Sequence, residues 1–371
     1  MEIPLVNLGR HHKKIEKEFF NRLKLTFRKG DYILGGPVKE FEDNFSKIID
    51  ARYTAGCSSG TSALELSLRA LGISNGDEVI TSDLTFFATV EAIHAVGAKP
   101  ILADVCPNTY GINLSTIKKV FTKKTKAIIP VHLYGNVSYM SEIEKFCKEK
   151  SLFLIQDAAQ AHLAKYNGQN IGKIGDFSCF SFYPGKNLGA TGDAGCVSGQ
   201  SKKLLERVKF LRDHGRSSKY VHEELALSAR MDSFQAIVLD IKLKDLKKVT
   251  QRRQEVAKIY DYYLKDFGFE SIICDEKGSC VYHLYPVLVK DRDIVLQKLQ
   301  SLGIGAGVHY PVNMSNQPGY YKIYGKNNLN AYSSKVSKHT ISLPICGEIT
   351  DKEVEYVAKS FLEIAKPYHL R

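Results

Sequence analysis

Short apolar runs alternate with longer amphipathic stretches over residues 53–198. The apolar runs have the length of buried strands, and the stretches between them carry apolar residues at helical spacing. The four clearest runs lie at residues 78–81, 100–103, 127–131 and 152–156. Strands and helices in alternation predict a mostly parallel sheet with helices on both faces. Ligands of such sheets bind beyond the carboxyl ends of the strands, so the residues that follow each run are candidates for a site.

The regions on either side of this alternation predict further helices. A helix is predicted from about Lys14 to Arg28, with its end near Gly30. A second long helical pattern starts at about Ser233 and keeps one apolar face as far as Val249. Both helices are amphipathic, so each is expected to cover part of a core.

The last third of the chain has a mixed pattern. It predicts, in order, a strand over residues 281–289, a helix over residues 293–303 and a strand toward Val308. We therefore predict a large α/β domain with an N-terminal arm over residues 1–245, and a smaller α+β domain over residues 246–371.

The composition fits this architecture and argues against several classes of protein. A chain of 371 residues with 44% hydrophobic residues can bury a large core. Its eight cysteines form no C-x-x-C pair, so neither a zinc cage nor a small disulfide framework is indicated, and reduced thiols are the simpler account. No basic-then-apolar leader and no apolar run approaching about 18 residues is present, so we expect a cytoplasmic protein with no membrane partner.

The strongest candidate for chemistry is Lys186. It follows the apolar, aromatic run at residues 178–183 and precedes a glycine-rich loop that reaches Gly195, which predicts a partly desolvated pocket. Desolvation lowers the pKa of an amine and makes it nucleophilic enough to form an imine with an aldehyde, for which pyridoxal phosphate is the obvious candidate. Most lysines simply lie on a solvated surface, so this interpretation depends on companion residues.

Several stretches supply such companions. The strand that ends at Asp157 could place a carboxylate at the pyridinium nitrogen of the cofactor, which makes the ring an electron sink. Residues 58–61 open a helix whose free N–H groups and dipole suit a phosphate, although an ordinary N-cap uses the same residue types. Phe86 could stack on the pyridine face, although an aromatic residue there is more often core. His309 and Tyr310 suit phosphate and sugar hydroxyls, but a buried structural pair is equally common.

Together these stretches resemble the DegT/DnrJ/EryC1/StrS sugar aminotransferases. The resemblance runs from about Pro4 to Leu343, and its motifs occur in the same order and spacing as in that family: Ser59–Leu64, Thr85–Thr89, Asp157–Gln160 and Ser181–Gly189. It implies a fold-type I pyridoxal-phosphate-dependent transferase of the aspartate-aminotransferase type, with a mostly parallel, seven-stranded-type sheet. It also implies an enzyme that aminates nucleotide-linked keto-sugars.

The resemblance implies a role for each matching residue around pyridoxal phosphate. Lys186 would be the Schiff-base lysine and the general base that moves a proton between donor and cofactor. Asp157 would hold the ring nitrogen, Gln160 would lie beside the 3-hydroxyl of the ring, and Phe86 would stack on it. The phosphate would be held by Gly60, Thr61 and Ser181.

The same resemblance implies a substrate site shared between two subunits. Tyr183, His309 and Tyr310 match positions that contact the sugar nucleotide, and Lys219 matches a lysine that reaches in from the second subunit. The predicted assembly is therefore a homodimer with shared active sites. The predicted reaction is amination at C-3 of a dTDP-linked 3-keto-6-deoxyhexose with L-glutamate as donor. It would serve the biosynthesis of a deoxyaminosugar for a surface polysaccharide such as lipopolysaccharide, or for natural-product glycosylation.

Two positions depart from the family pattern. Ser228 replaces an asparagine that normally reaches the cofactor phosphate of the partner subunit, and a shorter hydroxyl would need a bridging water there. Ser315 stands where many relatives have histidine. We therefore expect weaker retention of the cofactor and an altered part of the substrate pocket.

The net charge of +12 raises the alternative of a nucleic-acid partner. The clearest basic cluster, at residues 242–248, has its lysines at helical spacing with leucines between them, which is typical of the solvated face of an amphipathic helix. We therefore expect no nucleic-acid partner. A positive field would instead attract a nucleotide diphosphate and a dicarboxylate amino donor.

Other functions remain open at this stage. Relatives on the same scaffold aminate C-4 of a sugar, a UDP-linked hexuronate or an inosose, and a non-catalytic pyridoxal-phosphate-binding regulator would keep the same pocket. From another class, Gly56–Gly60 satisfies the G-x-S-x-G nucleophile elbow of an α/β hydrolase, with Ser58 as nucleophile and Asp157 and His309 following in the required order. That alternative leaves the motif around Lys186 without a role.

Overall fold

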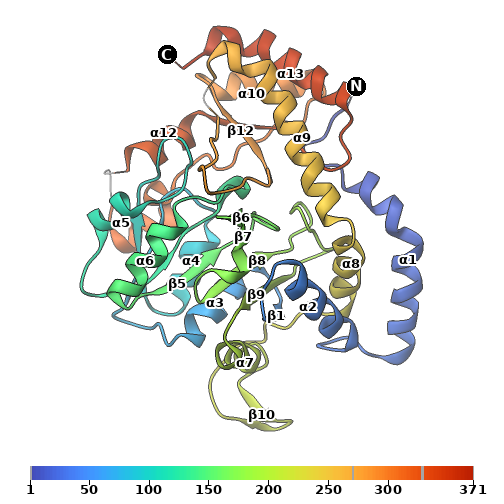
Figure 1. Cartoon of the computed structure of the whole chain (residues 1–371), viewed down its shortest axis with the longest axis vertical. Helices are drawn as coiled ribbons and strands as arrows, with labels where there is room; N and C mark the ends of the chain where they lie inside the picture. The colour runs from blue at the N-terminus through green and yellow to red at the C-terminus, as the bar shows by residue number, and fades with distance from the viewer. Residues whose placement is uncertain (1, 270, 327–329, 371) are drawn as a thin grey trace.

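A seven-stranded sheet forms the centre of the molecule (Figure 1). The structure is a computed structural model that describes residues 2–269, 271–326 and 330–370. In spatial order the strands are β1 (Tyr53–Cys57), β9 (Gly195–Gly199), β8 (Phe177–Ser181), β5 (Phe153–Asp157), β4 (Thr125–Ile129), β2 (Glu78–Ser82) and β3 (Lys99–Ala103). Strand β9 runs antiparallel to both of its neighbours, and the other pairs are parallel. The predicted mostly parallel sheet is therefore confirmed.

Helices connect the strands and cover the sheet. In chain order they are α1 (Leu8–Lys29), α2 (Gly36–Ile48), α3 (Gly60–Ala70), α4 (Ala88–Ala95), α5 (Leu114–Val120), α6 (Met140–Lys150), α7 (Lys202–Leu211), α8 (Ser233–Leu243), α9 (Leu246–Leu264), α10 (Arg292–Ser301), α11 (Pro318–Tyr324), α12 (Ala331–His339) and α13 (Asp351–Ala365). The shorter strands are β6 (Lys165–Tyr166), β7 (Gln169–Asn170), β10 (Arg216–Ser218), β11 (Val221–His222), β12 (Tyr285–Leu288) and β13 (Thr340–Leu343).

The sheet is buried on both faces because successive strand residues point in opposite directions. Ile128 and Phe180 pack in one apolar cluster with α2, α6 and α8. Their chain neighbours Ile129 and Cys179 pack in a second cluster with α3, α4 and α7. Both faces of the central strands are therefore packed mainly with apolar side chains, and the polar residues Asp157 and Ser181 stand at the ends of β5 and β8.

Helix α1 begins earlier than the sequence pattern predicts. The side chain of Asn7 accepts a hydrogen bond of 3.1 Å from the backbone N–H of Arg10 and starts the helix at Leu8. The end is as predicted, because Gly30 adopts the left-handed conformation, with φ of 67°, that closes a helix. Ile15 and Phe19 of α1 pack against the sheet cluster.

The long helical pattern after Ser233 forms two helices rather than one. Helix α8 ends at Leu243 and α9 begins at Leu246, with Asp245 at the start of the second helix. Aspartate is unfavourable in helix interiors, which is consistent with a break here, although the Asp245 side chain forms no capping hydrogen bond.

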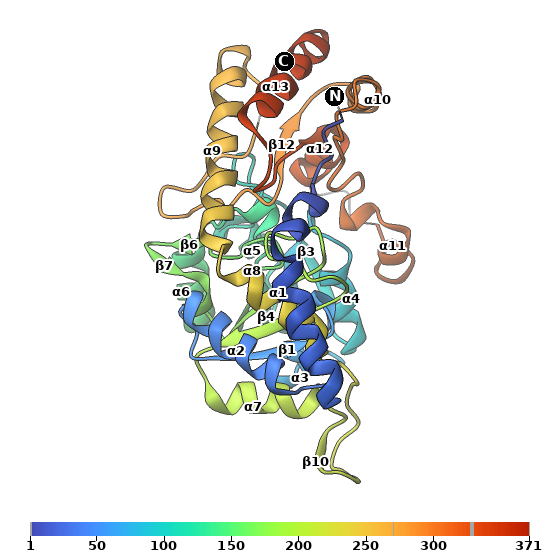
Figure 2. The ribbon, with the colours of Figure 1, turned by 90° about the vertical axis from the view of Figure 1, so that its right-hand side faces the viewer.

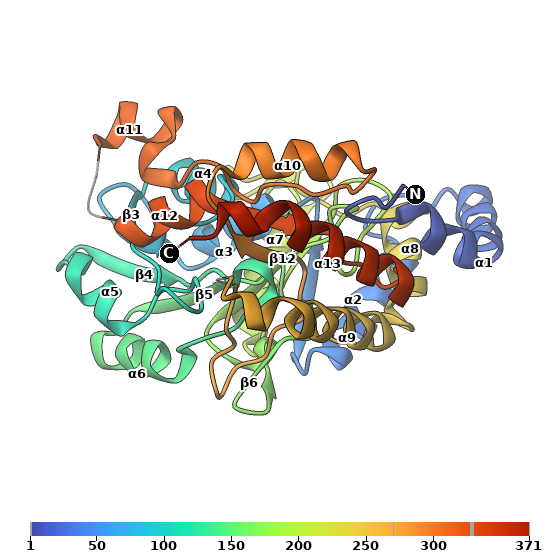
Figure 3. The same cartoon turned by 90° about the horizontal axis from the view of Figure 1, so that it is seen from above.

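The last third of the chain forms a separate apolar cluster that includes α9, α10 and α13 (Figure 3). The strand predicted over residues 281–289 is shorter in the structure. Strand β12 covers only Tyr285–Leu288, and it pairs with β13. Near the predicted strand at Val308, Gly307 forms a single bridge with Ser342. The division into domains at residues 245 and 246 stays a prediction.

Among the described residues, no helix has both the length and the apolar character needed to cross a membrane.

Candidate active site

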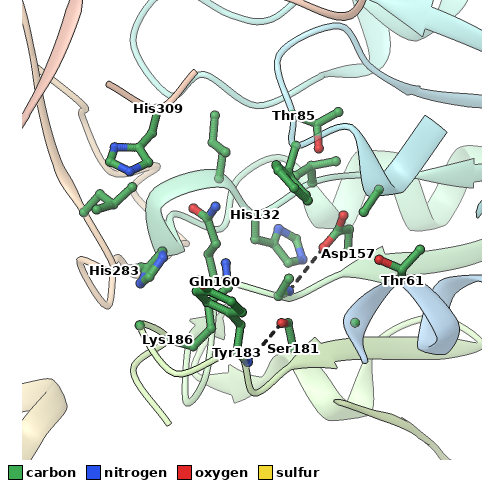
Figure 4. Close-up of a pocket in the computed structure, with 18 of the residues that line it drawn as sticks. Thr61, Thr85, His132, Asp157, Gln160, Ser181, Tyr183, Lys186, His283 and His309 are labelled. Atoms are coloured by element: carbon green, nitrogen blue, oxygen red, sulfur yellow. Dashed lines mark hydrogen bonds between the residues drawn. The ribbon is translucent and has the colours of Figure 1, made fainter. Parts of the chain in front are cut away.

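A cavity of about 560 Å³ opens at the carboxyl ends of the central strands (Figure 4). Asp157 ends β5, Ser181 ends β8, and α3 begins beyond β1, so three elements direct side chains or free backbone groups into the same space. The predicted site residues that line the cavity are Gly60, Thr61, Phe86, Asp157, Gln160, Ser181, Tyr183, Lys186, His309 and Tyr310. The structure therefore brings together residues that lie up to 250 positions apart in the chain.

Lys186 lies in the loop that follows β8. Its backbone N–H donates a hydrogen bond of 2.8 Å to the carbonyl of Tyr183, which turns the side chain back into the cavity. The side chain is half-buried, and burial lowers the pKa of its amine to about 8, an effect that the nearby charge of Asp157 opposes. A substantial fraction of the amine is therefore uncharged, and nucleophilic, slightly above neutral pH.

The Asp157 carboxylate is buried opposite this amine. Its Oδ2 atom accepts a hydrogen bond of 2.8 Å from the Thr89 hydroxyl, and its Oδ1 atom accepts one of 3.2 Å from the backbone N–H of Ala159. Burial raises the pKa of Asp157, while these two donors and the charge of Lys186 lower it. The arrangement gives a carboxylate that is held rigidly and faces a cationic partner in the cavity.

The N-terminus of α3 forms a shallow cradle beside Ser181. Ser59 caps the helix by accepting a hydrogen bond of 3.1 Å from the backbone N–H of Ser62. A Cβ atom on Gly60 would lie 2.7 Å from the Cβ atom of Ser181, and one on Gly195 would lie 2.3 Å from the carbonyl oxygen of Ser59. Only glycine permits this close packing, which leaves the first N–H groups of the helix open to an anion such as a phosphate.

Aromatic rings form one wall of the cavity. The rings of Phe86 and Tyr310 lie 5.5 Å apart between centroids, and the Nε2 atom of Gln160 donates a hydrogen bond of 3.2 Å to the hydroxyl of Tyr310. The Oε1 atom of Gln160 accepts one of 2.6 Å from the backbone N–H of Tyr134. The side-chain amide of Gln160 is thus fixed at both its oxygen and its nitrogen. The Phe86 side chain is 57% exposed and lines the cavity, so the face of its ring is open toward the cavity.

Three histidines also line the cavity. Burial lowers the pKa of His132 and of His309 to about 4, and lowers that of His283 well below its usual range, so all three are neutral near pH 7. His132 bonds through Nε2 to the side chain of Gln156 at 2.9 Å, and His283 bonds through Nδ1 to that of Asn187 at 3.2 Å.

Sequence reasoning missed His132, His283 and the role of Thr89. His132 follows the end of β4, and Asp157 ends β5, so the rule that pointed to Asp157 could also have pointed to His132. His283 lies within an apolar run that predicts a strand, and this pattern gave no reason to expect it in a site. Thr89 lies in the Thr85–Thr89 motif, and only the fold shows that its hydroxyl contacts Asp157.

Two of the predicted residues do not line the cavity. Lys219 lies at the turn between β10 and β11, in a hairpin that projects from the body of the molecule (Figure 2), and its ammonium lies 5.1 Å from the centroid of the Tyr220 ring. Ser228 is exposed and accepts a hydrogen bond of 3.1 Å from the guanidinium of Arg230. Their predicted contact with a second subunit stays a prediction.

Neither Ser58 nor Ser315 belongs to the cavity lining. The Ser58 hydroxyl hydrogen-bonds that of Ser62 at 2.8 Å and does not line the cavity, and the Nδ1 atom of His309 faces the Ser342 hydroxyl at 3.0 Å. The hydrolase interpretation is therefore wrong. Ser315 lies outside the cavity lining and donates a hydrogen bond of 3.0 Å to Asp83.

The residues present fit pyridoxal phosphate. The cofactor has an aldehyde, a basic ring nitrogen, a flat aromatic face and a phosphate. The cavity offers the Lys186 amine, the Asp157 carboxylate, the open face of Phe86 and the cradle that Gly60 makes possible.

Comparison with known proteins gives a consistent result. The sequence model of the DegT/DnrJ/EryC1/StrS aminotransferase family matches residues 13–362. The chain is 38% identical, over 96% of its length and 98% of the relative, to dTDP-3-amino-3,6-dideoxy-alpha-D-galactopyranose transaminase of Aneurinibacillus thermoaerophilus. It is 34% identical, over 85% of its length and 88% of the relative, to UDP-2-acetamido-2-deoxy-3-oxo-D-glucuronate aminotransferase of Pseudomonas aeruginosa. NtdA of Bacillus subtilis, crystallised with the bound cofactor PMP, superimposes with a TM-score of 0.91 at 28% identity, over 98% of this chain and 85% of that one.

Proposed function

The chain belongs to the DegT/DnrJ/EryC1/StrS aminotransferase family, and from this premise we propose that it aminates C-3 of a dTDP-linked 3-keto-6-deoxyhexose with L-glutamate as donor. It is a pyridoxal-phosphate-dependent aminotransferase of a family that acts on nucleotide-linked sugars. The convergence of the Lys186 amine, the Asp157 carboxylate and the N-terminus of α3 on one cavity supports the transamination chemistry, and the 38% identity to a dTDP-3-amino-3,6-dideoxy-alpha-D-galactopyranose transaminase supports the choice of acceptor.

The cofactor, when bound, supplies an electron sink for the pair of electrons left on a carbon that loses a proton. Lys186 has the amine that would bind it, since the lowered pKa keeps part of that amine uncharged. Once the amino donor has taken its place, the same Nζ atom would take the proton from the donor Cα and pass it to the C4′ carbon of the cofactor. One lysine therefore serves as anchor and then as general base.

Other residues of the cavity orient the cofactor. Asp157, oriented by Thr89, would hold the proton on the ring nitrogen, because a buried carboxylate favours a cation beside it. Phe86 offers its face to the ring. Gly60, Thr61 and the Ser181 hydroxyl would hold the phosphate at the N-terminus of α3, and Gln160 would lie beside the 3-hydroxyl, since all four residues line the cavity.

The sugar nucleotide binds at the open side of the same cavity. Tyr183 is exposed there, and His309 and Tyr310 form the adjacent wall. A neutral His309 contacts sugar hydroxyls without attracting the donor carboxylates that a charged imidazolium would bind.

A second copy of the chain completes the site. The hairpin that carries Lys219 and the segment directly after it expose apolar side chains, with Tyr220 81% and Leu225 100% exposed. Apolar residues on a projecting loop favour burial against a partner. In a homodimer, Lys219 would meet the phosphates of the nucleotide in the partner's cavity, and Ser228 would approach the cofactor phosphate there.

The closest alternative is a UDP-linked 3-keto-sugar as acceptor, which the relative from Pseudomonas aeruginosa supports. Amination at C-4, or of an inosose, would place a different carbon over Lys186. The cavity contains the same catalytic groups for all of these acceptors, so the choice rests on the nucleotide and on the position of the keto group.

The test is a panel of keto-sugar nucleotides incubated with the holoenzyme and L-glutamate, with products identified by mass spectrometry and NMR. We expect a 3-amino-3,6-dideoxyhexose on dTDP and 2-oxoglutarate in equal amounts. Preferential amination of a UDP-sugar, or of a 4-keto-sugar, would overturn the assignment of the acceptor. Failure of glutamate alone to convert the cofactor to its aminated form would overturn the assignment of the donor.

A further inference from the structure

Lys242 is a buried lysine of α8. The sequence pattern places it on the solvated face of a helix, and for this residue that expectation is wrong, since it is only 6% exposed. Its Nζ atom donates a hydrogen bond of 2.7 Å to the carbonyl of Gly189 and lies 3.1 Å from the Nε2 atom of His12. Burial of an ammonium is unfavourable, and a methionine would fill a similar volume without that cost. Packing alone therefore does not explain a lysine at this position.

The two partners of Lys242 are a carbonyl and an imidazole rather than a carboxylate. Burial and the charge of Lys242 lower the pKa of His12, so its ring is neutral near pH 7 and can accept through Nε2. Burial lowers the pKa of Lys242 itself to about 8, an effect that the charge of Glu348 opposes. Most Lys242 side chains are therefore protonated at neutral pH, and the bond to Gly189 is charge-assisted, which makes it stronger than a bond between neutral groups.

The carbonyl that Lys242 holds belongs to the loop that carries Lys186. The N–H of Ala190 donates a hydrogen bond of 2.7 Å to the carbonyl of Phe182 and closes this loop at its base. A Cβ atom on Gly189 would lie 2.1 Å from the carbonyl oxygen of Pro184, so the backbone after Lys186 packs directly against the backbone before it. A bond that fixes Gly189 therefore fixes the loop on both sides of Lys186.

A second side chain of α8 binds the same end of the loop. Gln235 lies seven residues before Lys242, which is two helical turns, so the two side chains share one face of the helix. The Oε1 atom of Gln235 accepts a hydrogen bond of 2.9 Å from the N–H of Thr191 and one of 3.0 Å from its hydroxyl. Another part of the chain binds Asn187, whose side-chain amide donates 3.1 Å to the carbonyl of Val281. The loop is therefore held by two separate segments.

We propose that Lys242 is a positioning residue for Lys186. By holding the carbonyl of Gly189, it fixes the backbone of the loop, so that rotation of the Lys186 side chain alone brings the amine to the cofactor and to the donor Cα. Misplacing a reacting group by about 1 Å is enough to slow a reaction by about a hundredfold. The inference rests on the role proposed above for Lys186 and does not depend on which keto-sugar is the acceptor.

The test compares Lys242→Met with the wild-type holoenzyme. Methionine keeps the length of the side chain but has no hydrogen-bond donor. We expect faster hydrogen–deuterium exchange in the peptide that covers residues 182–191 and a weaker circular dichroism band of the bound cofactor. The single-turnover reaction with L-glutamate should slow by about tenfold, with little change in the glutamate concentration that gives half the maximal rate.

Tyr260→Phe is the matched control. The Tyr260 hydroxyl donates a buried hydrogen bond of the same length, 2.7 Å, to the carbonyl of Pro344, and neither residue lines the cavity. This variant should lower Tm and leave the loop exchange, the circular dichroism and the rate unchanged. Lys242→Arg keeps a cationic donor and should lie nearer to wild type than Lys242→Met in all three measurements. If Lys242→Met does not fold, Lys242→Gln carries the same prediction, because its shorter amide does not reach Gly189.

Three results would overturn the proposal: wild-type behaviour of Lys242→Met, a slower reaction without faster exchange in the loop, and a looser loop without a slower reaction. Equal effects in Lys242→Met and Tyr260→Phe, or in Lys242→Met and Lys242→Arg, would also overturn it. A wrong assignment of Lys186 gives a different result, because borohydride would then fix the cofactor to another lysine of the wild-type protein.

Discussion

The cavity and the β10–β11 hairpin are built in opposite ways. In the cavity, Asp157 and Gln160 are buried and each is held by two hydrogen bonds, and the histidines are neutral. In the hairpin, Lys219 is exposed and contacts only the ring of its neighbour Tyr220 among the interactions of the described chain. Rigid, pre-formed groups suit the cofactor, whereas an exposed cation is free to meet a partner. The difference separates the residues that one chain brings together from Lys219, whose contact with a second chain is a proposal.

The largest effect is expected for the anchor in the cavity. Lys186→Ala removes both the amine that binds the cofactor and the base that moves the proton, so turnover should be abolished together with the yellow absorbance of the bound cofactor. Absorbance spectra and product assays measure both. Lys202→Ala, which removes an exposed lysine of α7, is the control and should behave as wild type. Multiple turnover by Lys186→Ala without an added amine would refute the role.

Next in size is the loss of the carboxylate opposite the anchor. Asp157→Asn keeps the shape but not the charge that holds a proton on the ring nitrogen, so we expect turnover to fall by about a hundredfold or more. Steady-state assays measure the fall, and spectra should show that the cofactor is still bound. Asp193→Asn changes another carboxylate of the cavity lining and should cost much less. Equal losses of turnover in the two variants would show that the total negative charge of the cavity matters, and not the position of the Asp157 carboxylate.

Cofactor uptake should depend on pH through Lys186. Its pKa in the folded protein is lowered to about 8 from an ordinary value of 10.5, and the uncharged amine is the reactive form. The rate at which the apoprotein takes up pyridoxal phosphate should therefore rise about tenfold per pH unit below that value and level off above it. Stopped-flow absorbance at varied pH gives the profile. A rate that keeps rising into the pH range of an exposed lysine would contradict the lowered pKa of this amine.

The hairpin is expected to act on the neighbouring subunit. Lys219→Ala removes a cation from the nucleotide phosphates, so we expect KM for the sugar nucleotide to rise by about tenfold, in keeping with the loss of one charge-assisted hydrogen bond. Cofactor binding and the reaction with glutamate alone should not change. Kinetics of the two half-reactions measured separately test this separation.

Mixed dimers decide which subunit Lys219 serves. In a hybrid of Lys186→Ala and Lys219→Ala chains, one of the two sites regains both native lysines if Lys219 acts across the interface. The hybrid should then show the wild-type KM with a reduced maximal rate. A hybrid that keeps the high KM of Lys219→Ala would place Lys219 in the site of its own chain.

The smallest effect is expected at Ser228. Ser228→Asn lengthens the side chain toward the cofactor phosphate of the partner, so the affinity of the apoenzyme for pyridoxal phosphate should rise a few-fold. Titration of apoenzyme with the cofactor measures it, and Ser217→Asn on the exposed hairpin is a control. An unchanged affinity would indicate that the hydroxyl already suffices or that the position lies elsewhere in the dimer.

The sequence predicted the sheet well, because buried strands and amphipathic helices leave clear periodicities. Glu78–Ser82 and Phe153–Asp157 begin and end within a residue or two of the predicted runs. The predicted strand at residues 281–289 was too long, since the N–H groups of Val281 and His283 pair with the loop at Tyr134–Gly135 instead of a sheet. Such pairing depends on tertiary contacts that no local pattern encodes.

A site residue was predictable from the sequence where it ends a strand or opens a helix. It was not predictable where its role depends on a hydrogen-bond partner from a distant segment of the chain. Asp157 and Gly60 belong to the first kind. Thr89 and His283 belong to the second, because their hydrogen bonds to Asp157 and Asn187 join segments far apart in the chain. Lys219 was recognised only through the family motif, since nothing about its own surroundings distinguishes it from a solvated lysine.

The most direct test of the account is to identify the lysine that binds the cofactor. Reduction of the holoenzyme with borohydride should fix the cofactor permanently, and digestion followed by mass spectrometry should place it on the peptide that contains Lys186, in an amount close to one per chain. Attachment to a different lysine, or no attachment at all, would contradict the account.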